Sequence, residues 1–152
     1  MPRKKSRGRK PTPHEAFLFE IKSWKPEYTF STNGSDDDDS PYSEHLELFL
    51  ETVCIEPEKL AGRNVSLLLS SRRNYLDPPL RKEGLDEKPK SIGHLHIPPS
   101  GGGFYTGVPH ESMAFLMTAL IHGQFRYAML SGPPLHRSQT WPTALNFMLS
   151  AE

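Results

Sequence analysis

Large apolar residues alternate with polar ones in several short stretches, and this period of two most constrains what the chain can fold into. Successive side chains of a β-strand point to opposite faces, so the alternation is typical of strands that bury one face. In residues 14–24, Phe17, Phe19 and Ile21 occupy every second position. Similar stretches predict strands at 65–70, 92–97, 125–130 and 144–149.

Residues 46–55 fit two patterns. Alternate leucines begin at Leu46, as in a strand, yet Phe49, Leu50 and Val53 follow Leu46 at the spacing of one helix face. The last part of this segment is β-branched, which favours a strand.

One segment, 109–122, predicts a helix. Pro109 suits a first helical position, Glu111 suits the positive first turn, and Gly123 can end the helix in a left-handed conformation. The expected core-facing side chains are Met113, Leu116, Met117, Leu120 and Ile121.

Turn-forming residues separate these stretches. The 15 prolines and 11 glycines exceed average usage. They predict exposed loops at 33–41 and 74–90, a turn or single helical turn at 56–63, and a flexible turn at the glycines 101–103.

The predicted fold class is α+β and mostly β. We expect an antiparallel sheet or a small β-sandwich of about five to seven strands, with one packed helix near 109–122. We expect residues 14–152 to form a single globular domain and residues 1–13 to be a disordered tail, because the tail has no large apolar side chain to bury.

The charge of the chain is unevenly distributed. The first ten residues contain no acid and six basic side chains, namely Arg3, Lys4, Lys5, Arg7, Arg9 and Lys10. Because the formal net charge of the whole chain is zero, residues 11–152 carry a net charge of −6. This segregation predicts a basic arm that can contact nucleic acid or another polyanion.

Residues 5–11 resemble the AT-hook, a minor-groove motif built on Arg-Gly-Arg followed by proline. Here Lys10 separates Arg9 from Pro11, which departs from the motif. The arm therefore indicates a general polyanion contact rather than the reading of A·T sequence.

His94 and His96 are weak candidate metal ligands, because alternate residues of a strand share a face. The pair resembles the beginning of the cupin metal motif, but no glutamate follows three or four residues later. Third ligands could come only from His110, Glu111, His122 or His136. In the simpler alternative, Leu95 and Ile97 face the core and the histidines face water.

Several function classes lack their motifs. The chain has no phosphate-binding loop, no dinucleotide fingerprint and no Gly-x-Ser-x-Gly elbow, and we expect no cofactor. Cys54 is the one cysteine, so no disulfide can form within the chain, which favours a reducing compartment in the cytoplasm, nucleoid or nucleus. No apolar run approaches the length of a membrane span.

These observations predict a non-catalytic binding or adaptor protein. Its domain would recognise an unknown protein partner, and its basic arm would contact nucleic acid. Two alternatives stay open: a small metal-dependent enzyme that uses His94 and His96, and a structural subunit of an assembly.

Overall fold

The computed structural model describes residues 13–32, 42–72 and 90–151. Its elements are β1 (Glu15–Thr32), β2 (Tyr42–Glu56), the 3-10 turn η1 (Glu58–Leu60), β3 (Asn64–Arg72), β4 (Gly93–His96), β5 (Gly102–Gly107), α1 (His110–Ile121), β6 (Tyr127–Gly132), β7 (Gln139–Thr140) and β8 (Ala144–Met148). Three predicted segments lie outside the described residues: the tail, the loop 33–41 and the loop 74–90. Of these segments, only Pro13 and Lys90 are described.

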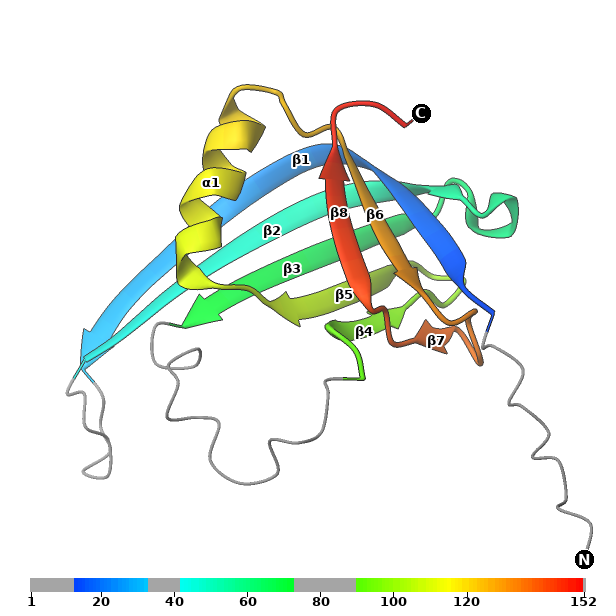
Figure 1. Ribbon diagram of the computed structural model, residues 1–152, viewed down its shortest axis with the longest axis horizontal. Helices are drawn as coiled ribbons and strands as arrows, with labels where there is room; N and C mark the ends of the chain where they lie inside the picture. The colour runs from blue at the N-terminus through cyan, green and yellow to red at the C-terminus, as the bar shows by residue number, and fades with distance from the viewer. Residues whose placement is uncertain (1–12, 33–41, 73–89, 152) are drawn as a thin grey trace, which may run out of the picture.

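The described strands form one sheet of eight strands in the order β7-β4-β5-β3-β2-β1-β6-β8. β3 and β5 run parallel, whereas the other neighbours are antiparallel. The sheet curls into a half-barrel, and α1 and β8 lie across its hollow side (Figure 1). The mostly β class is confirmed, whereas a purely antiparallel sheet or a sandwich of five to seven strands is wrong. Alternation locates strands but does not say which strands become neighbours.

Alternation decides which side of the sheet is buried. In β2, Leu48, Leu50 and Cys54 are buried together with Thr52, and the residues between them are more exposed. Residues 46–55 therefore form a strand, and the helical alternative is excluded. We call the buried side the inner face and the opposite side the outer face.

The helix α1 packs on the inner face. It begins one residue after Pro109, which is its N-cap, and Gly123 follows it with φ +66°, as predicted. Met113, Leu116 and Leu120 are buried, but Ile121 is 67 % exposed and its predicted core position is wrong. Ala119 is buried instead, which turns the buried stripe of the helix away from Ile121.

No described helix is long and apolar enough to cross a membrane.

The glycines 101–103 do not form a flexible turn. Gly101 has φ +115° and turns the chain, but Gly102 and Gly103 already belong to β5. The sequence did not indicate a strand here because glycine has a low strand propensity. Glycine is nevertheless favoured at position 102, because a Cβ there would overlap the carbonyl oxygen of His96.

Candidate functional site

The basic residues Arg3, Lys4, Lys5, Arg7, Arg9 and Lys10 lie outside the described residues, but the place where their segment joins the domain is defined. Glu15 at the start of β1 pairs with Gly132 of β6. A Cβ on Gly132 would lie 2.8 Å from the Cα atom of Pro142 and 3.2 Å from the carbonyl oxygen of Trp141. The basic segment therefore precedes a strand that begins close to the Trp141–Pro142 backbone.

His94 and His96 lie on the outer face of β4, while Leu95 and Ile97 are fully buried. This confirms the simpler alternative for the orientation of β4. The Nε2 atom of His94 lies 2.9 Å from Oε1 of Gln139, so Nε2–H donates to this amide oxygen. The ring centroids of the two histidines are 6.3 Å apart at an interplanar angle of 18°.

The structure does not complete a metal site around these histidines. Within the described ranges, no three His, Cys, Asp or Glu side chains gather closely enough to hold an ion. His110, one of the proposed third ligands, instead lies at the start of α1 and contacts Ser71 and Glu44. The described neighbours of His94 are instead Gln139, which is polar, and Trp141, which is aromatic.

The outer face carries a row of rings and apolar side chains that the sequence does not bring together. The ring centroid of Trp141 lies 5.0 Å from that of His94, and His94 is opposite Tyr105 in the β4–β5 register. Tyr105 is opposite Leu68 of β3, which is opposite Phe49 of β2. Residues directly opposite one another share a face of the sheet. We call these five residues the outer-face row.

Two members of the row are prominent at the surface. Trp141 is 54 % exposed and Tyr105 is 55 % exposed. No spacing in the sequence indicates this row, since its members come from four strands and the segment after β7. Only the strand register could have revealed it.

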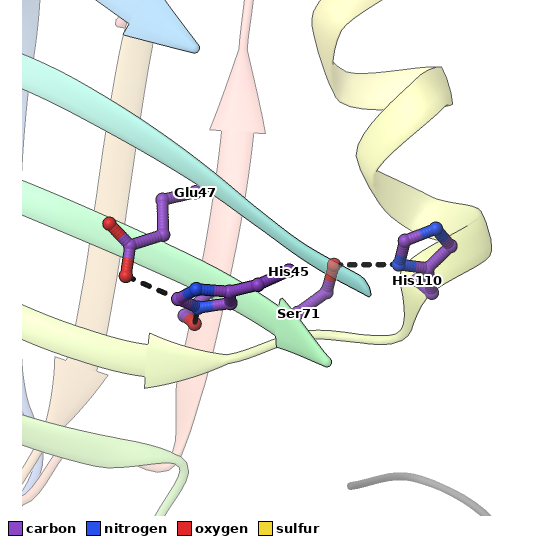
Figure 2. A network of polar contacts seen from close by, with 5 residues as sticks. His45, Glu47, Ser71 and His110 are labelled. Carbon is purple, nitrogen blue, oxygen red and sulfur yellow. Dashed lines mark hydrogen bonds and ion pairs between the residues drawn. The ribbon is translucent and has the colours of Figure 1, made fainter. Parts of the chain in front are cut away.

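A second group of polar side chains connects α1 to the ends of β2 and β3 (Figure 2). The Oγ atom of Ser71 lies 3.0 Å from Nδ1 of His110, and Nε2 of His110 lies 2.7 Å from Oε1 of Glu44. On the outer face, Nε2 of His45 lies 2.8 Å from Oγ of Ser70 and 3.2 Å from Oε1 of Glu47. Residues far apart in the sequence thus fix the end of the sheet near the first turn of α1.

The Ser71–His110–Glu44 contacts have the residue types of a nucleophile, a base and an orienting carboxylate. However, Ser71 is only 2 % exposed, so a substrate carbonyl cannot approach its hydroxyl in this arrangement. The contacts instead hold the first residue of α1 against two strands. We therefore assign them a positioning role for the helix.

A pocket of about 380 Å³ lies between α1 and β8. Its lining is largely apolar and consists of Leu69, Ile92, Thr106, Gly107, Val108, Pro109, Ser112, Phe115, Leu116, Leu145 and Phe147. Its volume is near the lower end of the range found for ligand pockets. The pocket can therefore hold one apolar side chain or a small apolar molecule.

Cys54 is a buried packing residue in β2, 1 % exposed, and its Sγ–H donates to the carbonyl oxygen of Glu56 at 3.2 Å. Burial raises the pKa of the thiol from 9.0 to about 11, although nearby Arg63 and the backbone of Glu56 act in the opposite direction. A thiol with a raised pKa is a poor nucleophile near neutral pH.

The raised pKa of Cys54 predicts a loss of stability at alkaline pH. The unfolded chain releases the thiol proton from about pH 9, whereas the folded chain holds it until about pH 11. This contribution to stability is complete below pH 9 and declines as the pH rises. Between pH 8 and 10.5, the free energy of unfolding in urea should fall by roughly 2 kcal/mol more in the wild type than in Cys54→Ala. Equal losses in both proteins would contradict the raised pKa.

The comparisons with protein-family models, with curated proteins and with solved structures find no match to this chain.

Proposed function

We propose that this chain is a non-catalytic binding protein. Its domain recognises a protein partner at the pocket between α1 and β8, and the basic residues among positions 3–10 attach it to nucleic acid or another polyanion. The observation that carries this proposal is an apolar pocket lined in part by β8, which is a terminal strand of the described sheet.

The pocket suits one large apolar side chain of the partner. Phe147 of β8 and Leu116 of α1 both line it; Leu116 belongs to the apolar core and Phe147 packs against it. Phe115 also lines the pocket and is 64 % exposed, so it can contact a bound group at the entrance. A buried apolar anchor is the usual source of affinity at a protein interface.

The edge of β8 adds a means of holding an extended peptide. β8 is the terminal strand of the sheet and pairs with β6 on one side. A partner strand that adds to its other side would form main-chain hydrogen bonds and would direct alternate side chains toward Leu145 and Phe147. The favoured partner therefore presents an extended segment with one large apolar residue.

Phe115→Ser tests the proposed partner site, with Ile121→Ser as the matched control. Ile121 lies on the same helix and is 67 % exposed, but it does not line the pocket. The full chain and both variants would be used to capture proteins from nuclease-treated lysate of the native cells, with quantitative mass spectrometry. We expect a partner retained by the wild type and by Ile121→Ser to be reduced at least about tenfold by Phe115→Ser.

Capture of the same proteins in the same amounts by all three chains would rule out this pocket as the partner site. Thermal unfolding of the variants checks that both remain folded, as their exposure predicts.

A further inference from the structure

We propose that the outer-face row is a stacking surface for single-stranded nucleic acid. The strand would lie across β7, β4 and β5, with its bases against Trp141, His94 and Tyr105. This site goes beyond the proposed partner pocket, which is on the inner side of the sheet, and it gives the basic arm of the proposed function a specific ligand.

The ring geometry of the row fits unstacked bases. Trp141 and Tyr105 each expose more than half of their surface, and His94 lies between them, 5.0 Å from Trp141 and directly opposite Tyr105. Leu68 continues the row with a partly exposed apolar side chain. Planar side chains on an open sheet stack with bases of any sequence. In a duplex the bases are already stacked on each other, so the row favours single strands.

The distribution of carboxylates favours binding of a polyanion to one half of the outer face, the half formed by β7, β4 and β5. Among the described residues 90–151, Glu111 is the sole acid, and it lies on α1 rather than on this face. Lys90 precedes β4 and Arg137 precedes β7. Phosphate groups can therefore approach the β7–β4–β5 half without strong repulsion.

The other half of the outer face is acidic. Glu47 and Glu51 alternate with the buried Leu48 and Leu50 of β2, so both face outward. Glu27 of β1 is opposite Glu47 and faces the same way. Ser66 donates to Glu51 at 3.0 Å and so holds one of these carboxylates in place. A polyanion would be confined to the half that contains Trp141 and Tyr105.

The basic arm joins the domain at the start of β1, close to the Trp141–Pro142 backbone. β1 begins at Glu15, opposite Gly132, whose backbone contacts Trp141 and Pro142. Figure 1 shows β7 and the start of β1 at the same end of the sheet. Residues 3–10 are within about 35 Å of Pro13 along the chain, since an extended chain spans at most about 3.5 Å per residue. Six cations attached at this point would add to the attraction for the phosphates of a strand that is stacked on the row.

Tyr105→Ala tests the surface, with Tyr28→Ala as the matched control. Tyr28 is 59 % exposed, but it is opposite Leu46 and so faces the inner side of the β1–β2 hairpin. Binding of fluorescein-labelled (dT)20 and (rU)20 to the full chain would be measured by anisotropy from 50 to 300 mM salt. We expect Tyr105→Ala and Trp141→Ala each to bind about tenfold more weakly, and Tyr28→Ala to bind as the wild type does.

Removal of residues 1–12 separates the contribution of the arm. It should reduce the slope of log affinity against log salt by up to about 4, while Tyr105→Ala leaves the slope unchanged. In a Trp24→Phe background, Trp141 is the one remaining tryptophan, and bound oligonucleotide should quench its fluorescence.

Three results would overturn the proposal: no binding of either oligonucleotide at 50 mM salt, equal binding by wild type, Tyr105→Ala and Trp141→Ala, or tighter binding of a duplex of the same length. Equal binding by these three chains, together with loss of binding on removal of residues 1–12, would assign the contact to the arm alone. The partner pocket would stand or fall separately, since Phe115 is on neither the row nor the arm.

Discussion

Gly102→Ala is expected to destabilise the protein by about 3 kcal/mol, whereas Gly103→Ala changes its stability by less than about 1 kcal/mol. A Cβ on Gly102 would overlap the carbonyl oxygen of His96 and would lie 2.9 Å from the Cα atom of Ile97. Both are backbone atoms at the end of β4, so they cannot withdraw without disturbing the β4–β5 pairing.

Gly103 is the natural control because it follows Gly102 in the same strand. Its Cβ would lie 3.5 Å from the carbonyl oxygen of Ser66, which is an ordinary contact. Alanine also reduces the conformational freedom of the unfolded chain, which offsets small losses in the folded state. Urea unfolding of both variants measures the difference, and equal free energies of unfolding would contradict the close approach of β4 to Gly102.

Leu95→Ala is expected to lower the free energy of unfolding by about 2–5 kcal/mol, and His96→Ala by less than about 0.5 kcal/mol. Leu95 is fully buried opposite Phe104, so truncation leaves a cavity in the core. His96 is the next residue of β4 but is exposed on the outer face. Thermal or urea unfolding of the two variants would compare them directly. Similar losses at both positions would mean that β4 does not turn Leu95 into the core.

The strands were predictable where one face is buried along several residues. Phe17, Phe19, Leu67 and Leu69 follow the alternation and are all buried. β7 was not predicted, because a strand of two residues has no period to detect. The parallel pairing of β3 with β5 was also missed, since it depends on the path of the chain between them rather than on the residues of either strand.

The candidate site was predictable only in part. The alternation of Leu95 with His94 and His96 assigned the histidines to the exposed face of β4. Their neighbours were not predictable, since Trp141 lies more than forty residues further along the chain and reaches His94 through the pairing of β7 with β4. Contacts of this kind follow from tertiary packing, which local patterns do not encode.

The two ends of the sheet are unequal, and this limits how copies of the chain can associate. β7 has two residues and is followed by Pro142, which has no N–H to donate, whereas β8 offers five residues at its free edge. Fibre growth needs two pairing edges on each molecule, so that every added copy presents a fresh one. Of the two terminal strands of the described sheet, β7 is the poorer pairing edge, because it is short and is followed by a proline. Open-ended growth through both ends of the described sheet is therefore disfavoured at β7.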